Sequence, residues 1–207
     1  MKMKKRTIII SLGIEFIKKR KEYREYIDSE LIKLINSCGY NVYLLNNFYH
    51  SNYNINNEKY ISYIIKKLNV CGIILPGGAD FGIYKKRDQT ELYLIRLSIR
   101  KNIPLLGICR GLQIINLFFK GKHKKIKNHV KKINKIEIYQ KYLNIKCYHN
   151  NSISKIGSDL KILSKSKDGC IESIKHKKYS IYGWMWHPER NLKYKIYFTK
   201  ELKKIFN

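Results

Sequence analysis

The strongest structural signal in this sequence is Ile103-Pro104-Leu105-Leu106-Gly107-Ile108-Cys109-Arg110-Gly111-Leu112-Gln113. Its first part is a short apolar run that predicts a buried strand, and residues 112–119 continue as a helical pattern. Between them, Gly107 and Gly111 stand two residues either side of Cys109. A strand, a tight turn and a helix in this order match a nucleophile elbow, with cysteine in place of serine. We expect both glycines to be required, because a Cβ on either would collide with its neighbours in so cramped a turn.

The expected turn places Cys109 at the first turn of a helix. Unpaired N–H groups and the helix dipole at that end favour a thiolate over a thiol. A single G-x-C-x-G pattern is weak evidence, because motifs this short recur by chance. The case for a catalytic cysteine therefore depends on partners elsewhere in the chain.

Length and composition indicate one domain over residues 1–207. The hydrophobic content of 44% is too high for a disordered chain. No apolar run approaches the roughly 20 residues that span a bilayer, so we expect no membrane segment. The basic residues 1–6 precede only a short apolar run, Thr7–Leu12, which lacks the small-residue cleavage site of a signal peptide. We therefore expect a cytoplasmic protein.

The five cysteines are odd in number and widely spaced, at Cys38, Cys71, Cys109, Cys147 and Cys170. With no C-x-x-C pair, this spacing argues against a disulfide framework or a zinc cluster and for a reducing compartment. The four besides Cys109 lie within or beside apolar segments. We expect them to be small buried hydrophobic residues.

The formal net charge of +28 raises the question of nucleic-acid binding. Only 8 of the 43 basic residues are Arg, and the Lys residues are spread along the whole chain. This distribution is typical of a compositional bias, whereas base readout and bidentate phosphate contacts prefer Arg. A basic nucleic-acid-binding protein therefore stays as a remote alternative. The charge is also expected to steer anionic small molecules towards the protein.

Strand-like and helical patterns alternate in the first half of the chain. Strands are predicted at Thr7–Leu12, Asn41–Leu45, Val70–Leu75 and Pro104–Ile108, and helices at Glu22–Ser37, Lys59–Leu68 and Asp88–Lys101, with Asp88 as N-cap and Asn46–Asn57 as a loop. Short apolar strands separated by helices imply a parallel sheet covered on both faces.

The second half is richer in strands. They are predicted at Ile133–Tyr139, Leu143–Tyr148, Leu160–Ser164, Cys170–Lys175 and Ser180–Trp186, with a closing helix at Lys195–Phe206. The fold class is therefore α/β, with a mostly parallel central sheet and antiparallel additions in the C-terminal half. Residues 120–132 hold seven Lys, which favours a solvated surface loop, and an anion site beside the elbow helix is the alternative.

A catalytic thiolate needs a base, and the base needs an orienting group. Of the six histidines, His187 ends an apolar strand and is followed by Pro188, which imposes an extended or turn geometry on it. Glu189 is then close enough to accept a hydrogen bond from the imidazole. This pattern suits a triad of Cys109, His187 and Glu189, although a His-Pro-Glu sequence alone is more often a surface turn.

An oxyanion hole needs backbone N–H donors that point at one site. Pro76-Gly77-Gly78-Ala79-Asp80 follows a buried strand, as Cys109 does. Because parallel strands end at the same edge of a sheet, the N–H groups of Gly78 and Arg110 are the expected donors. Taken alone, the two glycines indicate no more than a turn.

Together these segments resemble class I glutamine amidotransferase-like proteins and, within them, the peptidase C26 group of γ-glutamyl hydrolases. The matching segments appear in family order at Leu75–Asp80, 86–91, Ile103–Gln113, His129-Val130, 148–151, 168–172 and Trp186–Glu189. The resemblance implies a flavodoxin-like three-layer sandwich and a site that needs no metal or cofactor. The roles that it implies are nucleophile for Cys109, base for His187, orienting group for Glu189, oxyanion donors for Gly78 and Arg110, and substrate contacts for Gln113 and His149.

A narrower resemblance, carried by Asp168–Glu172, Lys175–Lys177 and Gly183–Arg190, is to γ-glutamyl-CDP-amidate hydrolases, which act in making the phosphoramidate of bacterial capsules. It implies a γ-glutamyl substrate joined through nitrogen to cytidine diphosphate, with Arg190 and the Lys-rich segment 120–132 as candidates for binding the diphosphate. The segment Phe119–Lys122 departs from the Gly-Gly pattern of the family, and His149-Asn150-Asn151 departs from its His-His-Gln pattern. The alternatives are a glutaminase subunit that delivers ammonia to a partner synthetase and a γ-glutamyl-GABA-type hydrolase.

Overall fold

The computed structural model describes residues 5–47, 55–127, 129–138 and 141–207. Its centre is a seven-stranded sheet in the order β11-β12-β13-β6-β5-β1-β4. Five neighbouring strands are parallel, and β11 and β12 are antiparallel additions at one edge, as expected. The strands are β1 (Thr7–Ser11), β4 (Asn41–Leu45), β5 (Val70–Leu75), β6 (Leu105–Ile108), β11 (Leu160–Lys165), β12 (Ile171–His176) and β13 (Ile181–Trp184).

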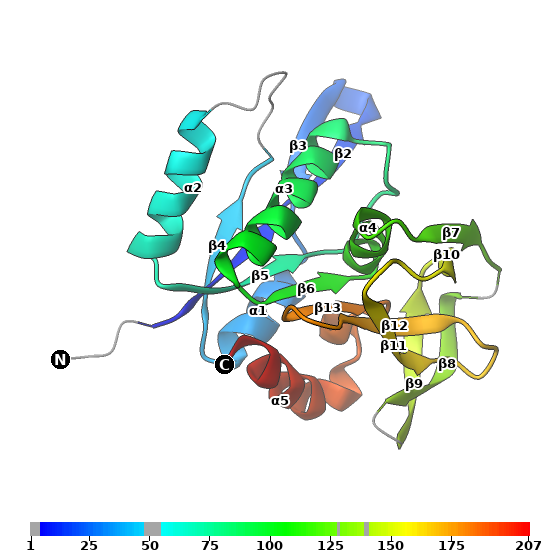
Figure 1. Ribbon diagram of the computed structural model, residues 1–207. Coiled ribbons are helices and arrows are strands. Elements are labelled where there is room, and N and C mark those ends of the chain that lie inside the picture. Colours follow the sequence, from blue (N-terminus) through cyan, green and yellow to red (C-terminus); the bar gives the residue numbers. More distant parts are fainter. Residues whose placement is uncertain (1–4, 48–54, 128, 139–140) are drawn as a thin grey trace.

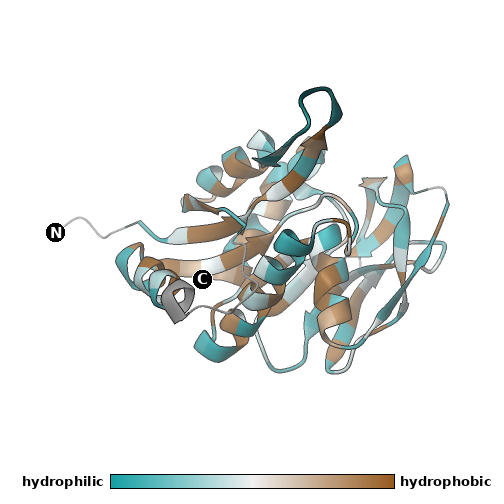
Figure 2. Cartoon of the chain, turned by 90° about the horizontal axis from the view of Figure 1, so that it is seen from above, coloured by the Kyte–Doolittle hydropathy of each residue, from teal (hydrophilic) through white to brown (hydrophobic). Residues whose placement is uncertain are grey.

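Helices cover both faces of this sheet, which makes three layers (Figure 1). The helices α1 (Ser29–Ser37) and α5 (Lys195–Phe206) lie on one face, and α2 (Ile55–Lys67), α3 (Lys85–Lys101) and α4 (Arg110–Phe118) lie on the other. In β1, Ile8 and Ile10 pack towards α1 and α5, whereas Ile9 packs on the opposite side. Because successive side chains of a strand point to opposite faces, a strand covered on both faces must be apolar throughout. The predicted α/β fold class is therefore confirmed, and the central strands are the hydrophobic layer in Figure 2.

Three smaller two-stranded sheets flank the central one. The first, β2 (Gly13–Ile17) with β3 (Glu22–Tyr26), is a hairpin joined by the 3-10 turn η1 (Lys18–Arg20). In the C-terminal half, β7 (Lys122–Lys125) pairs with β10 (Asn151–Lys155), and β8 (Val130–Ile138) pairs with β9 (Lys141–Tyr148). Two further 3-10 turns, η2 (Pro188–Arg190) and η3 (Leu192–Tyr194), connect β13 to α5.

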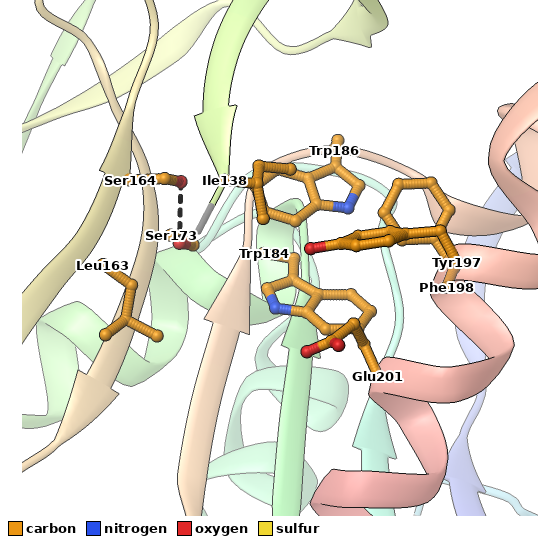
Figure 3. A pocket seen from close by; sticks show the side chains of 9 residues that line it. All are labelled: Ile138, Leu163, Ser164, Ser173, Trp184, Trp186, Tyr197, Phe198 and Glu201. Carbon is orange, nitrogen blue, oxygen red and sulfur yellow. Dashed lines mark hydrogen bonds between the residues drawn. The ribbon is translucent and has the colours of Figure 1, made fainter. Parts of the chain in front are cut away.

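An aromatic cluster supports the segment that follows β13. The rings of Trp184 and Trp186 stack with their centroids 5.5 Å apart, and Phe198 of α5 lies 6.1 Å from Trp186. Figure 3 shows these rings with Tyr197 and Glu201 around a small void between α5 and the sheet. Burial of such large rings contributes several kcal/mol of transfer free energy. The packed rings therefore fix the position of the segment that carries His187.

The predicted helix at Glu22–Ser37 is wrong in its first part. Residues Glu22–Tyr26 form β3, and α1 begins only at Ser29, because the side chain of Asp28 accepts a hydrogen bond from the backbone N–H of Glu30 at 3.0 Å. An aspartate in this position satisfies one of the free N–H groups of the first turn and so sets the start of a helix. Residues 22–26 form a strand instead of a helix because they pair with β2, a strand that the sequence pattern did not predict.

Two further boundaries differ from the predictions. The helix α3 begins at Lys85, so Asp88 is not its N-cap; its carboxylate instead accepts from the N–H of Gly82 and pairs with Arg110. The Lys-rich segment 120–132 is not only a loop, because it contains β7 and the start of β8. Of the predicted loop Asn46–Asn57, residues 48–54 lie outside the described residues, and the last three already belong to α2.

All five cysteines are free thiols; of the four expected to be buried, Cys38 and Cys147 are, whereas Cys71 and Cys170 are partly exposed. Within the described ranges, no helix is long and apolar enough to cross a membrane.

Candidate active site

Cys109 lies at the junction of β6 and α4, immediately before the first residue of the helix. Its backbone has φ +53° and ψ −104°, a region that a residue with a side chain rarely adopts. A Cβ on Gly107 would lie 2.3 Å from the carbonyl of Gly111, and a Cβ on Gly111 would lie 2.0 Å from the carbonyl oxygen of Leu75. The expectation that both flanking positions require glycine is therefore confirmed. We refer to residues 107–111 as the elbow.

His187 follows β13, the parallel neighbour of β6, so the two strands deliver His187 and Cys109 to the same edge of the sheet. Its Nδ1 lies 2.6 Å from Oε1 of Glu189. Pro188 is the first residue of η2, and this turn places the carboxylate beside the imidazole as the sequence pattern predicts. Both side chains are buried.

Cys109 and His187 meet at the turn that follows β5. A Cβ on Gly77 would lie 2.5 Å from Cε1 of His187 and 3.6 Å from Cβ of Cys109, so the three residues are packed against one another. Burial lowers the pKa of His187, but hydrogen bonds and charge interactions with Cys109 and Glu189 outweigh it and raise the pKa to about 9. A nearby imidazole is one of the groups that activate a cysteine nucleophile.

The two expected oxyanion donors are adjacent to this group. Arg110 is the first residue of α4, so its N–H belongs to the set that has no intrahelical acceptor. Gly78 has φ +143°, a conformation that favours glycine, and a Cβ there would lie 2.2 Å from Nη1 of Arg87. The turn that carries Gly78 therefore passes beside the elbow, as the topology predicted.

A buried ion-pair network lies under both turns, and the sequence reasoning assigned it no role. Arg110 pairs with Asp88 and Glu91, and Arg87 donates to Glu91 at 2.8 Å. Two positive and two negative groups balance one another, and desolvation lowers the pKa of Arg110 to about 9 and that of Arg87 to about 10. The available signal was the spacing of Arg87 and Glu91, which are one helical turn apart and carry opposite charges.

Arg87 also connects this network to the Gly77–Gly78 turn. Its Nη2 donates to the carbonyl oxygens of Pro76 at 2.7 Å and of Gly77 at 2.9 Å. The far side of the same turn is held by Asp80, whose carboxylate accepts from Lys125 at 2.8 Å and from Asn151 at 2.9 Å. The Lys-rich segment thus touches the predicted oxyanion turn through β7.

The structure places Gln113 and Arg190 near the proposed nucleophile and base in different ways. Gln113 is buried one helical turn after Cys109, with its amide 3.8 Å from the sulfur of Met185. Arg190 is partly exposed, and its guanidinium donates to Asp28 at 3.1 and 3.2 Å while lying over the ring of Tyr148. An anion bound by Arg190 would therefore share it with the Asp28 carboxylate.

His149, expected near the substrate, has both ring nitrogens engaged elsewhere. Its Nδ1 lies 3.0 Å from the carbonyl oxygen of Asn151, and its Nε2 lies 3.2 Å from Nδ1 of His129. The side chain is buried in a second cluster of polar groups that includes Glu172. Its expected role towards the substrate stays a prediction.

The β2–β3 hairpin contributes to two cavities, of which the first opens at the proposed catalytic residues. The first is lined by Gly77, Gly78 and His187 together with Tyr26 and Arg190. The second has a volume of about 450 Å³ and is lined by Ile14, Tyr23, Glu25, Ile83, Tyr84, Lys85 and Lys86. It combines aromatic rings with cationic side chains at the start of α3.

The chain is similar in sequence and in fold to several known proteins. γ-Glutamyl-CDP-amidate hydrolase of Campylobacter jejuni is 39% identical over 137 residues, which is 63% of this chain and 66% of that protein. The GMP synthase (glutamine-hydrolysing) of Borrelia garinii is 34% identical over 137 residues, 60% of this chain and only 25% of its own length. A crystal structure of a glutamine amidotransferase from Thermotoga maritima superposes with a TM-score of 0.62 at 14% identity, covering 99% of this chain and 86% of that one. The model of the class-I glutamine amidotransferase family matches residues 25–200, and the chain belongs to that family.

Proposed function

We propose that this protein is a cysteine-dependent hydrolase that cleaves γ-glutamyl amides and releases glutamate. The observation that carries the proposal is the meeting of Cys109 and His187 at the Gly77 turn, with Glu189 hydrogen-bonded to the far nitrogen of the imidazole. A nucleophile, a base and an orienting carboxylate in this order are the parts that acyl transfer requires.

The proposed reaction has two steps. The Cys109 thiolate attacks the γ-carbonyl carbon, and the N–H groups of Gly78 and Arg110 stabilise the oxyanion. His187 gives its proton to the leaving nitrogen as the C–N bond breaks, which leaves a glutamyl thioester and a neutral imidazole. His187 then takes a proton from water as the water attacks the thioester. Glutamate departs, and the thiolate–imidazolium pair is restored.

We propose a nucleotide-linked leaving group, as in γ-glutamyl-CDP-amidate. The hydrolase from Campylobacter jejuni bears this name and is 39% identical over the matched region. The 450 Å³ cavity supports the proposal, because Tyr23 and Tyr84 offer ring faces for a base and Lys85 offers a charge for a phosphate. Glu25, which also lines the cavity, accepts hydrogen bonds from the N–H of Asn47 at 3.0 and 3.2 Å, so part of its charge is already satisfied.

A test of the function compares turnover of γ-glutamyl-CDP-amidate, γ-glutamyl-GABA and glutamine by the purified protein, with Cys109→Ala as the inactive control. We expect the nucleotide amide to be hydrolysed fastest and mass spectrometry to detect a trapped glutamyl adduct on Cys109. Full activity in Cys109→Ala would overturn the mechanism. Faster turnover of γ-glutamyl-GABA would favour the other hydrolase class.

A glutaminase that supplies ammonia to a separate synthetase is the second candidate, favoured by the similarity to the GMP synthase of Borrelia garinii. The same residues would serve both roles, and they differ in dependence on a partner. Glutamine turnover that appears only when a synthetase is added would support this second candidate.

A role in capsule phosphoramidate synthesis is the cellular counterpart of the proposed substrate. Loss of phosphoramidate from the capsule after deletion of the gene, restored by the unmodified gene and not by Cys109→Ala, is the expected result. An unchanged capsule would show that the protein has no role in capsule phosphoramidate synthesis, whichever amide it hydrolyses.

A further inference from the structure

A second cluster of reactive side chains lies outside the proposed catalytic residues. It consists of His129, Cys147, His149 and Glu172, all buried, and one donor atom of each lies within 4.8 Å of the others. Cys147 belongs to β9 and Glu172 to β12, while the two histidines flank the β8–β9 hairpin. The cluster therefore lies where the hairpin packs on the central sheet.

The three separations among the nitrogen and oxygen donors are close to the edge length of a tetrahedron around a metal ion, and the sulfur of Cys147 lies within 4.8 Å of each of them. Nδ1 of His129 lies 3.2 Å from Nε2 of His149, and each of these atoms lies 3.5 Å from Oε1 of Glu172. Four ligands at about 2.0–2.1 Å from zinc are about 3.3 Å apart. The two 3.5 Å separations are longer than ordinary N–H···O hydrogen bonds but are suitable for ligands that share one ion.

Glu172 is a buried carboxylate whose nearest positive or polar groups are the two imidazoles, each 3.5 Å from Oε1. It is 0% exposed, and neither carboxylate oxygen has a hydrogen-bond partner among the residues that the structure describes. A buried carboxylate without hydrogen bonds is costly unless a positive charge balances it. A bound cation would satisfy both requirements at once.

The outer nitrogens of the two histidines are already anchored. Nε2 of His129 lies 2.6 Å from Oδ2 of Asp168, and Nδ1 of His149 lies 3.0 Å from the carbonyl oxygen of Asn151. Metal-bound histidines are oriented in this way, by an oxygen that accepts the N–H of the second nitrogen. With a hydrogen on each outer nitrogen, the inner nitrogens, which face one another across the cluster at 3.2 Å, are available as ligands once an ion displaces the hydrogen that they share.

One side chain competes with an ion for this position. The amide Nδ2 of Asn134, in β8, lies 2.8 Å from Nδ1 of His129. An ion bound to that nitrogen would require the amide to turn aside. Removing the Asn134 amide should therefore strengthen ion binding, whereas removing a ligand should weaken it.

We propose that His129, Cys147, His149 and Glu172 bind one zinc ion in a closed, structural site. Two imidazoles, a thiolate and a carboxylate form a ligand set typical of zinc, and the two anionic ligands neutralise its charge. The Cys147 thiol gives its proton to solvent when the ion binds. The ion would join the β8–β9 hairpin to β12, and the proposal is independent of which amide the protein hydrolyses.

The first experiment measures zinc content after the folded full-length protein is loaded with zinc and dialysed. It uses a Cys109→Ala background so that the proposed nucleophile contributes no thiolate. We expect about one zinc per chain, lost in Cys147→Ser and in the isosteric Glu172→Gln, and retained in Cys38→Ser, a matched buried cysteine of the core. Zinc content that is negligible, or equal in all four proteins, would overturn the proposal.

The second experiment does not depend on whether the ligand variants fold. Cobalt(II) added to the zinc-free protein in the same background should give the intense visible bands of a tetrahedral site together with a thiolate charge-transfer band. Asn134→Ala should bind zinc several-fold more tightly, because the competing amide is gone. An octahedral cobalt spectrum, or an Asn134→Ala variant that is destabilised and binds no zinc, would show a hydrogen-bonded cluster instead of a metal site.

Discussion

Nη2 of Arg87 donates a 2.9 Å hydrogen bond to the carbonyl oxygen of Gly77, and this bond orients the peptide that leads into Gly78. In a planar trans peptide the C=O of one residue and the N–H of the next point in opposite directions. Holding the Gly77 oxygen on the side of Arg87 therefore directs the Gly78 N–H to the other side of the turn. Arg87 is a positioning residue for the proposed oxyanion donor, and Glu91 holds Arg87 in place.

Replacing Arg87 should affect the proposed reaction through this peptide. Arg87→Lys keeps the charge but removes the two-carbonyl fork, and we expect kcat to fall by about 10- to 100-fold while KM changes little. Steady-state kinetics on the γ-glutamyl substrate measure kcat and KM separately. Arg96→Lys, a change on the same helix away from the turn, is the control. Equal kcat values for the two variants would contradict the positioning role.

The backbone of Cys109 predicts an unusual order of stabilities. At φ +53° and ψ −104° a Cβ is strained, so Cys109→Gly should be more stable than Cys109→Ala by about 1 kcal/mol or more. Urea unfolding of both variants measures the difference, and an alanine variant as stable as the glycine one would show that the elbow stores no strain.

The raised pKa of His187 predicts how stability depends on pH. Its pKa is about 9 in the folded protein against an ordinary value of 6.5, so its interactions with Cys109 and Glu189 stabilise the fold fully below about pH 6.5. That contribution should be lost as the pH rises through about 9. The difference in unfolding free energy between the unmodified protein and His187→Gln should therefore shrink between pH 7 and pH 10. A constant difference would mean that the imidazole is neutral in the folded state.

The 450 Å³ cavity predicts a selective defect. Tyr84→Ala should raise KM for the nucleotide-linked amide by about 10-fold, because loss of one stacking face costs about 1–3 kcal/mol. Turnover of glutamine, which has no base to stack, should change less than twofold. Tyr63→Ala, at an exposed tyrosine of α2, is the control. If Tyr84→Ala impaired turnover of both substrates equally, the leaving group would bind outside this cavity.

Much of the fold was predictable because it follows from local patterns. The apolar strands ending at Leu75 and Ile108 were recognisable from composition, and the parallel sheet follows from their alternation with helices. The β2–β3 hairpin was missed because its partner strand, β2, carries no strong strand pattern in the sequence. The side chain of Tyr23 is also largely exposed, so burial does not mark β3 as a strand. Strand pairing between weakly patterned segments is decided by tertiary contacts.

The sequence by itself determined the elbow at Cys109, the partner pattern His187-Pro188-Glu189 and the α/β class. Each is encoded within a few residues, by glycines that admit a close approach or by proline that restricts a turn. Only the tertiary structure decided which buried groups meet. Arg87 and Arg110 share the carboxylate of Glu91 because α3 packs beside α4, and the histidines at the ends of the β8–β9 hairpin converge on Glu172 because this hairpin packs against the edge of the central sheet. Spacing in the chain carries no record of such contacts, which is why the absence of a C-x-x-C pair said nothing about that cluster.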